Sequence, residues 1–503
     1  MKTSIIGYPR IGSLRELKFA SEKYFRNEIT ADELQSTAKE LRKLNLDVQK
    51  NSGLDFIPSN DFSFYDGMLD TAFLLGAVPK RYKDLDLPEL DTYFAAARGY
   101  QGDHGDVKAF AMKKWFNTNY HYMVPEIDDD TKLSLSGNKP FDLYNEALEN
   151  GVKTKSVIIG AYTFLKLARY TGSKNANDFV DAAIAAYKDI LAKFSGLGAE
   201  WVQIDEPCLV MDMDADDKAL FDKIYKEVLS AKGSVKVLLQ TYFGDVRDCY
   251  SDICALDFDG IGIDFVEGKK SLELVKSNGF PKDKVLFAGV VNGKNIWKNH
   301  YANTVKLVDE IKKHSGEVVI NTSCSLLHVP YTLENESKLD ESYKKHFAYA
   351  KEKLSELAEL KTILSADSPE DTAEYKNNVK LFSEPRSGAN ADVQKKVSEL
   401  TDKDFVRLPV FEEREKVQKA RFKLPLLPTT TIGSFPQTKE IRAERAAFRK
   451  NEITQEEYDK FLEKQITDCI RLQEDIDIDV LVHGEFERND MVEYFGECLD
   501  GYI

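Results

Sequence analysis

Eight short runs rich in β-branched and other apolar residues recur along the first 325 residues. Continuous apolar runs of this length are typical of strands that are buried on both faces of a parallel sheet. Helix-like stretches such as 177–194 and 217–231 separate most of these runs. Eight alternations of strand and helix predict an α/β fold, a (β/α)8 barrel. The runs are Ser4–Tyr8, Leu54–Pro58, Ser156–Gly160, Trp201–Asp205, Val235–Thr241, Gly260–Phe265, Val285–Val291 and Val318–Thr322.

Two regions depart from this simple alternation. The segment 61–155 is too long for one loop between a strand and a helix, so we expect it to carry extra helices. After the eighth run, Leu333–Leu364 predicts one long helix, and a later charged region contains a second candidate helix, Glu412–Arg421. The prolines in Leu424–Pro428 favour an extended linker after it.

Near its end the chain repeats the pattern of its beginning. Several pairs of motifs are related by a constant offset of 424 residues, and the opening motif is related by 426. We interpret the match as a duplicated domain. The pairs are Ile6–Pro9 with Ile432–Pro436, Asn27–Thr30 with Asn451–Thr454, Asp61-Phe62 with Glu485-Phe486, and Asp66 with Asp490.

The repeat predicts how the chain is divided. We expect residues 1–365 to form a barrel with its insertion at 61–155, and residues 366–427 to form a helical and extended linker. Residues 428–503 would then begin a second barrel that this stretch of chain does not complete, so we expect a fragment. The alternative is a small unit appended to a single barrel.

Composition narrows the class of protein. A chain of 503 residues with 42% hydrophobic and 31% charged residues describes a soluble globular protein of two large domains. The net charge of −16 disfavours nucleic acid or an anionic membrane as the main partner. No apolar run approaches a membrane span, and the first residues do not resemble a signal peptide. Six scattered cysteines fit a reducing cytoplasm.

Polar residues follow the predicted strands, where barrel enzymes place their sites. Asp205-Glu206 resembles a glycosidase acid pair, but adjacent strand residues point to opposite faces, so a structural rim is at least as well supported. Asp264 and Cys324 lack the further ligands that a zinc site needs, and a lone buried cysteine is more often part of the core.

Basic residues gather after the first run, at Arg10, Arg15 and Lys18. Guanidinium and ammonium groups suit carboxylates or phosphates, which would make this loop an anion-binding segment. A solvated helix face explains the same residues equally well, and their spacing does not separate the two interpretations.

Five segments together resemble the cobalamin-independent methionine synthase family, 5-methyltetrahydropteroyltriglutamate–homocysteine methyltransferase, and the fungal or plant type is the most similar. The resemblance runs from end to end of the chain. The segments are Tyr8–Gly12 with Arg15–Lys18, Lys114–His121, Gln203–Pro207, Thr431–Gln437 and His483–Arg488.

The resemblance implies two (β/α)8 barrels and methyl transfer from a folate nitrogen to the sulfur of homocysteine. It also implies a zinc ion in the second barrel that binds the substrate thiol as a thiolate, which is the nucleophilic form. Because the methyl group on a tertiary amine is a poor electrophile, protonation of the nitrogen and alignment of donor with acceptor must supply the remaining activation.

Matching the family's motifs assigns roles to ten residues. The folate-binding set includes Lys18, which would hold a carboxylate of the polyglutamate tail, and the homocysteine-binding set includes Glu485, which would hold the amino group. Asp61, the repeat partner of Glu485, is also acidic, although no homocysteine is expected in the first barrel. A structural role for the acid at this position is therefore the alternative. The sets are Arg15, Glu16, Leu17, Lys18, Lys114 and Asn119 for folate, and Ile432, Gly433, Ser434 and Glu485 for homocysteine or methionine.

The family's metal ligands and its general-acid histidine have no counterpart here, so we expect zinc ligands beyond residue 503 and none in this chain. The equivalent first-barrel positions are Tyr242, Gly244, Asp264 and Cys324. We therefore expect no catalytic residue in the chain, no activity from it alone, and a cytoplasmic monomer whose partners are 5-methyltetrahydropteroyltriglutamate and L-homocysteine. The alternatives are a non-catalytic folate-binding barrel or scaffold, and a barrel hydrolase that uses Asp205 or Glu206.

Overall fold

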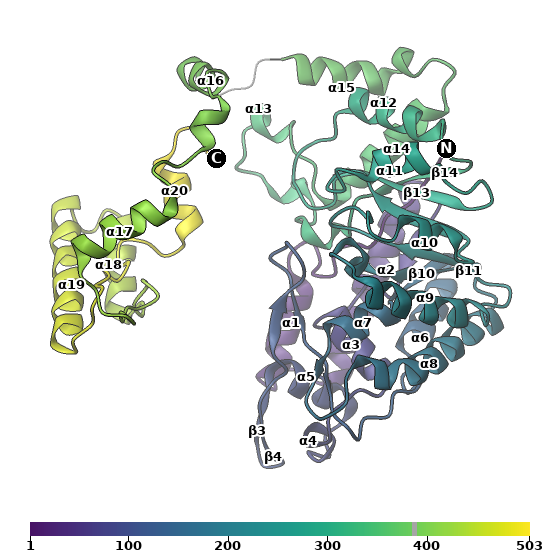
Figure 1. Ribbon diagram of the computed structural model, residues 1–503, viewed down its shortest axis with the longest axis horizontal. Coiled ribbons are helices and arrows are strands. Elements are labelled where there is room, and N and C mark those ends of the chain that lie inside the picture. Colours follow the sequence, from purple (N-terminus) through teal and green to yellow (C-terminus); the bar gives the residue numbers. More distant parts are fainter. Residues whose placement is uncertain (385–389, 503) are drawn as a thin grey trace. The chain divides into compact units, whose positions relative to one another are not determined.

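The computed structural model describes residues 1–384 and 390–502. The chain divides into two compact units, Met1–Glu384 and Pro385–Ile503, and each is described here by itself. Figure 1 shows the strands and most of the helices in the first unit. Residues 385–389 of the predicted linker, and Ile503 of the predicted second barrel, lie outside the described residues.

Eight parallel strands form the sheet of the first unit, in the order β1-β14-β13-β12-β11-β10-β8-β2. A parallel bridge between Ser4 and Phe56 joins the two edge strands, and the Phe56 N–H donates to the Thr3 carbonyl at 3.0 Å. The sheet therefore curls round until its edges meet. The strands are β1 (Lys2–Thr3), β2 (Ile57–Ser59), β8 (Thr154–Ile159), β10 (Trp201–Asp205), β11 (Lys236–Gln240), β12 (Gly260–Asp264), β13 (Val285–Val291) and β14 (Val318–Thr322).

Seven of the predicted runs overlap observed strands, and the first one is wrong in its position. The run Ser4–Tyr8 mostly follows β1 instead of forming it. Its amides leave the ladder, because the Ile6 N–H donates to the Thr322 hydroxyl at 3.2 Å and the Tyr8 N–H donates to the Asp61 carboxylate at 2.7 Å. Along this run, side-chain oxygens therefore take the place of the main-chain carbonyls that a neighbouring strand would provide.

Most helices of the first unit lie on the outside of the sheet and bury one face. Along α8 the buried residues recur at three- and four-residue spacing, and the Asn175 side chain caps its first turn. The predicted helices 177–194 and 217–231 are confirmed as α8 and α9. The helices are α1 (Glu16–Phe25), α2 (Ala31–Asn51), α6 (Lys139–Glu149), α7 (Ala161–Leu167), α8 (Ala176–Gly196), α9 (Ala215–Leu229), α10 (Tyr250–Ala255), α11 (Ser271–Asn278), α12 (Tyr301–Lys312) and α14 (Ala350–Ser365).

The insertion contains the extra helices that its length predicts, and also short strands that were not predicted. Two antiparallel hairpins, β3–β4 and β5–β6, stand outside the main sheet, and β7 pairs with β9. Besides α6, the elements of the insertion are α3 (Gly67–Leu74), α4 (Lys80–Lys83), α5 (Glu89–Arg98), β3 (Tyr100–Gly102), β4 (Gly105–Val107), β5 (Met112–Lys114), β6 (His121–Met123) and β7 (Glu126–Ile127), and β9 (Arg169–Tyr170) follows β8 outside it.

The interior of the sheet is layered, because alternate residues of each strand point inward. Near the amino-terminal ends of five strands the inward residues are apolar. Two positions further along β10, β11 and β14 the inward residues are polar, namely Gln203, Gln240 and Asn321. Along β10, Trp201 belongs to the apolar layer, whereas Gln203 and Asp205 lie above it. The apolar layer consists of Phe56, Trp201, Leu238, Phe287 and Val319.

The predicted helix Leu333–Leu364 is wrong in its first half. Only α14 is continuous, and the preceding residues form a 3-10 turn, Leu333–Asn335, and the short helix α13 (Glu341–Lys344). Glu352, at the start of α14, stabilises the 3-10 turn. Its carboxylate accepts hydrogen bonds from the Thr332 hydroxyl at 3.0 Å and from the Leu333 N–H at 3.2 Å.

The first unit extends beyond the expected boundary at residue 365. Helix α15 (Ala373–Ser383) belongs to it because Asn378, which is buried, links it to the start of α12. The side-chain oxygen of Asn378 accepts a hydrogen bond from the Tyr301 N–H, and its side-chain NH2 group donates to the Asn299 main-chain carbonyl, both at 2.9 Å.

The second unit repeats the local structure of the start of the first. Thr3 donates to Asp55 through its N–H and its hydroxyl at 2.8 and 3.0 Å, and Thr429 donates in the same way to Asp479 at 2.7 and 2.8 Å. Thr30 and Thr454 each form a capping box with a glutamate three residues later. The predicted helix 412–421 is confirmed as α17. The described helices are α16 (Ala391–Ser398), α17 (Phe411–Phe422), α18 (Lys439–Arg449), α19 (Gln455–Asp475) and α20 (Met491–Cys498).

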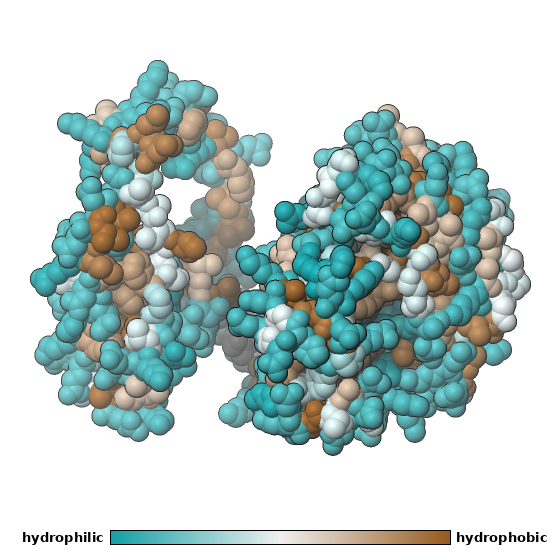
Figure 2. Space-filling model, turned by 90° about the horizontal axis from the view of Figure 1, so that it is seen from below, coloured by the Kyte–Doolittle hydropathy of each residue, from teal (hydrophilic) through white to brown (hydrophobic). Residues whose placement is uncertain are grey.

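Many large apolar side chains of the second unit are exposed. Phe405 is 77% exposed, Leu426 is 95% exposed and Ile432 is 100% exposed. Figure 2 shows apolar residues gathered over this unit, at the left of the view. None of the described helices is long and apolar enough to cross a membrane.

Replacing Phe287 with alanine tests the apolar layer. Phe287 is fully buried between strands, so we expect the first unit to lose about 3–5 kcal/mol of unfolding free energy. Urea unfolding followed by tryptophan fluorescence measures the loss. Phe19→Ala is the control, because Phe19 is 51% exposed and its loss should change stability by about 0.5 kcal/mol or less. Equal losses in the two variants would contradict the layered interior.

Candidate functional site

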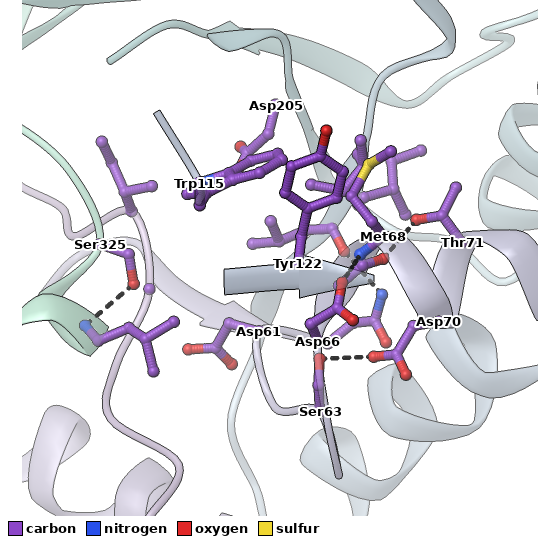
Figure 3. A pocket seen from close by; sticks show the side chains of 18 of the residues that line it. Asp61, Ser63, Asp66, Met68, Asp70, Thr71, Trp115, Tyr122, Asp205 and Ser325 are labelled. Atoms are coloured by element: carbon purple, nitrogen blue, oxygen red, sulfur yellow. Dashed lines mark hydrogen bonds between the residues drawn. The ribbon is translucent and has the colours of Figure 1, made fainter. Parts of the chain in front are cut away.

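A cavity of about 110 Å³ opens at the carboxyl ends of the barrel strands (Figure 3). The ends of β8 and β10 and the residues that follow β1, β2, β11 and β14 contribute to it, together with α3 and the β5–β6 hairpin. This is the end at which barrel proteins place their sites. Its polar and aromatic lining includes Arg10, Asn60, Asp61, Ser63, Asp66, Asp70, Trp115, Tyr120, Tyr122, Lys139, Asp205, Tyr242, Ser325 and His328.

A buried polar network forms the floor of the cavity. The Lys155 ammonium donates to the Ile5 carbonyl at 2.8 Å and to the side-chain oxygen of Gln203. The Gln203 amide donates to Asp205 at 2.7 Å, and the Tyr242 hydroxyl donates to the other Asp205 oxygen at 3.2 Å. Burial lowers the pKa of Lys155 to about 7 and raises the pKa of Asp205 to about 7.

Asp66 and Asp70 also line the cavity, and each is held by several contacts. Asp66 accepts from the N–H groups of Met68, Leu69 and Met123 at 2.8–3.1 Å, and burial raises its pKa to about 7. Asp70 pairs with Lys139 at 2.9 Å. The sequence analysis missed Asp70 and Lys139, although the four-residue spacing of Asp66 and Asp70 at the start of α3 places both on one face of that helix.

The acid pair Asp205-Glu206 does not form a joint site. Asp205 faces the barrel interior, whereas Glu206 accepts from the N–H groups of Tyr162 and Thr163 at 2.9 and 2.7 Å. Glu206 also accepts from the Tyr225 hydroxyl, so it caps the start of α7 outside the barrel. The alternation argument is confirmed, and the two carboxylates cannot act on one glycosidic bond.

Asp264 and Cys324 are also held by structural contacts. The Asp264 carboxylate accepts from the N–H groups of Phe243, Val266 and Glu267 at 2.8–3.1 Å. Burial raises the pKa of Asp264 to about 6 and raises the pKa of the Cys324 thiol. A protonated buried thiol is a poor metal ligand, which supports the core interpretation.

The predicted folate-binding residues lie on two separate elements of the first unit. Arg15 and Lys18 are exposed at the start of α1, and Leu17 is buried and anchors that helix. Glu16 accepts from the Leu14 N–H at 3.0 Å, which holds the turn in place. Lys114 and Asn119 are exposed on the β5–β6 hairpin. The described residues that line the cavity do not include any of these predicted folate-binding residues.

The predicted homocysteine-binding residues come together in the second unit. A parallel bridge joins Ser434 to Gly484, and the Ser434 hydroxyl donates to the Glu485 carboxylate. Arg488 pairs with the same carboxylate and, together with Ser434, holds its pKa below the ordinary range. Gly433 has φ of +120°, a backbone conformation that other residues rarely adopt, so the turn favours glycine. Ile432 is fully exposed beside them.

The zinc ion that the family implies does not fit a ligand set here. Across residues 1–384 and 390–502, no group of three or more His, Cys, Asp or Glu side chains could hold a metal ion. Structural and catalytic zinc sites need at least three protein ligands. We therefore derive no chemical step through a metal from the described residues.

Comparison with known proteins identifies the family. Residues 2–316 match the cobalamin-independent synthase N-terminal domain, and residues 427–503 match the cobalamin-independent synthase catalytic domain. The first match covers more than half of the chain. The protein belongs to the cobalamin-independent synthase family, which confirms the resemblance in its broad form.

Two relatives are named 5-methyltetrahydropteroyltriglutamate–homocysteine methyltransferase. The protein from Streptococcus thermophilus is 56% identical and that from Lactococcus lactis is 53% identical, each over 503 residues. The alignments cover 100% of this chain and 66% of each relative, so the chain spans about two thirds of their length. Because both relatives are bacterial, they do not support the expected fungal or plant type.

A solved structure supports the fold. The putative vitamin-B12 independent methionine synthase from Listeria monocytogenes aligns with a TM-score of 0.50 and 14% sequence identity. The alignment covers 73% of this chain and 98% of that chain. At this identity the similarity shows the fold and carries no conclusion about the reaction.

The capping role of Glu206 predicts a pH dependence of stability. Burial raises its pKa to about 7, so the folded protein keeps a proton that the unfolded chain releases near pH 4.5. Raising the pH from about 5 to 7 should therefore favour unfolding through this group, by at most ~1.4 kcal/mol per pH unit. We expect Glu206→Gln to remove that slope.

Urea unfolding at several pH values measures the difference in slope between the two proteins. The comparison isolates Glu206 because the other buried acids are present in both. Parallel slopes for wild type and Glu206→Gln between pH 5 and 7 would contradict the assignment.

Proposed function

We propose that the protein transfers the methyl group of 5-methyltetrahydropteroyltri-L-glutamate to L-homocysteine and forms L-methionine. Membership of the cobalamin-independent synthase family supports the reaction, as do the names of relatives at 53–56% identity. The observation that carries the proposal is the meeting of Ser434 and Glu485, which are 51 positions apart, on neighbouring loops of the second unit. A hydroxyl beside a charged carboxylate suits the polar end of an amino acid.

In this proposal the second unit binds homocysteine by its amino-acid group. The depressed pKa keeps Glu485 ionised at neutral pH, so it can accept from the substrate ammonium. The N–H groups around Gly433 and the Ser434 hydroxyl would meet the substrate carboxylate. Arg488 already pairs with Glu485, so the ammonium must share that carboxylate or displace the guanidinium.

The first unit would bind the anionic methyl donor. Arg15 and Lys18 present two cationic groups at the exposed start of α1, where a chain of glutamate carboxylates can reach them. Lys18 already lies 3.8 Å from Glu22, and this exposed contact is weak enough for a substrate carboxylate to replace. Lys114 and Asn119 would contact the folate from the β5–β6 hairpin.

The reaction breaks the bond between the methyl carbon and the folate nitrogen and forms a bond from that carbon to sulfur. The thiol of homocysteine loses a proton, and the folate nitrogen gains one. We propose that a zinc ion, whose ligands are expected outside the described residues, would supply ionisation of the thiol when bound. The inactivity of residues 1–503 alone stays a prediction, as do the monomeric state and the cytoplasmic location.

A non-catalytic folate-binding barrel or scaffold remains the second candidate, because the exposed cations of α1 could bind the folate tail without any catalysis. A direct assay separates the candidates. Methionine formation by a longer form of this protein that contains the expected ligands, lost on chelation and restored by zinc, would support the enzyme. Tight folate binding without turnover in that form would support the scaffold.

Replacing Lys18 with alanine tests the donor site. We expect the triglutamate donor to bind about 5–10-fold more weakly, because one cation facing the tail is lost, and the monoglutamate form to bind unchanged. Isothermal titration at two salt concentrations measures both affinities. Lys23→Ala on the same helix is the matched control, and an equal loss in both variants would contradict a specific role for Lys18.

Replacing Glu485 with glutamine tests the amino-acid site. The substitution keeps the shape but removes the charge that faces the ammonium, so we expect homocysteine to bind about tenfold more weakly. Equilibrium dialysis with labelled homocysteine provides the measurement. Glu487→Gln provides a neighbouring control, and unchanged affinity in Glu485→Gln would remove this residue from the site.

A further inference from the structure

Among the aspartates that line the cavity of the first unit, Asp61 makes the fewest contacts with the described residues. Asp61 follows β2 and lies among the lining side chains of Figure 3. One of its oxygens accepts from the Tyr8 N–H at 2.7 Å. Within residues 1–384 and 390–502, no lysine or arginine nitrogen lies within 4.0 Å of this carboxylate. Burial raises the pKa of Asp61, and the more distant charges of Lys155 and Lys139 only partly offset that effect.

The other charged side chains that line the cavity are held by more contacts than Asp61. Asp66 is held by three backbone N–H groups, and Asp70 pairs with Lys139. Asp205 belongs to the network of Lys155 beneath the cavity. The Arg10 guanidinium donates to the Ser63 carbonyl at 2.6 Å and lies 5.7 Å from the centre of the Tyr120 ring. A cation that enters the cavity would therefore meet Asp61 as its counter-ion.

The walls of the cavity suit the rest of such a ligand. Trp115 and Tyr122 pack edge to face at 5.5 Å, and both line the cavity. Aromatic faces attract cations and cover alkyl groups. His328 adds no positive charge, since burial and the nearby Lys294 lower its pKa to about 4. A space of about 110 Å³ admits a molecule of only a few heavy atoms.

We propose that this cavity binds a small primary ammonium compound, with its nitrogen on Asp61 and its alkyl part against Trp115 and Tyr122. A primary ammonium has three N–H donors, and Ser325 and Asp205 add acceptor oxygens to the lining. A quaternary ammonium would use the aromatic faces but would leave these acceptors unused. The site is independent of the proposed methyl transfer, which uses the exposed residues of α1, the β5–β6 hairpin and the second unit.

Titration of the whole chain with ethylammonium chloride tests the proposal. Isothermal calorimetry and tryptophan fluorescence should show saturable binding of one ligand per chain, and ethanol, which lacks the charge, should not compete. Asp61→Asn should weaken binding at least tenfold, while its side-chain oxygen can still accept from the Tyr8 N–H. Asp84→Asn is the matched control, because Asp84 pairs with Lys80 on the surface, and its affinity should equal that of wild type.

Several outcomes would overturn the proposal. They are absence of saturable binding, equal affinity in Asp61→Asn, and equal binding of ethanol and ethylammonium. Tighter binding of tetramethylammonium would indicate an aromatic cage instead, and tighter binding of glycine would indicate a site for a zwitterion. If Asp61→Asn does not fold, the comparison of ethylammonium with ethanol on wild type decides the question, because charge is the main difference between the two ligands.

Discussion

The inward alternation along the barrel strands is the constraint on which the rest of the first unit depends. Apolar residues such as Trp201 and Phe287 close the amino-terminal end of the barrel, and polar residues two positions further along form the floor of a cavity. Because every second residue points inward, the same strand can contribute an apolar side chain to the core and, two positions later, a polar side chain to the cavity. The same alternation separates Asp205 from Glu206 and assigns one to the cavity and the other to a helix cap.

The repeat in the sequence has a physical meaning at the level of individual hydrogen bonds. Thr3 with Asp55 in the first unit, and Thr429 with Asp479 in the second, join two distant chain segments by the same pair of contacts. The acids Asp61 and Glu485, which are related by the repeat, each accept a hydrogen bond from an earlier loop of their unit, at Tyr8 and Ser434. The two loops differ in what they offer to a ligand: Asp61 faces an aromatic cavity, whereas Glu485 is shared between Ser434 and Arg488.

Much of this arrangement could be predicted from sequence. Apolar runs and helical periodicity located nearly all of the barrel strands, because burial on both faces leaves a strong local signal. The position of β1 and the break before α14 could not be predicted, since each depends on distant acceptors, Asp61 and Glu352, that replace backbone partners. The cavity pair of Asp70 and Lys139 was missed for the same reason, because 69 positions separate two residues that meet only in the folded chain.

We propose that the two units bind different substrates: the first unit binds the anionic donor, and the second unit binds the amino acid. Hydrogen exchange measured by mass spectrometry, with each substrate added separately, tests that division most directly. The account predicts that the triglutamate donor protects amides near residues 14–18 and 112–121, and that homocysteine protects amides near 432–434 and 484–486. Protection of the same segments by both substrates, or of the opposite unit by either one, would contradict it.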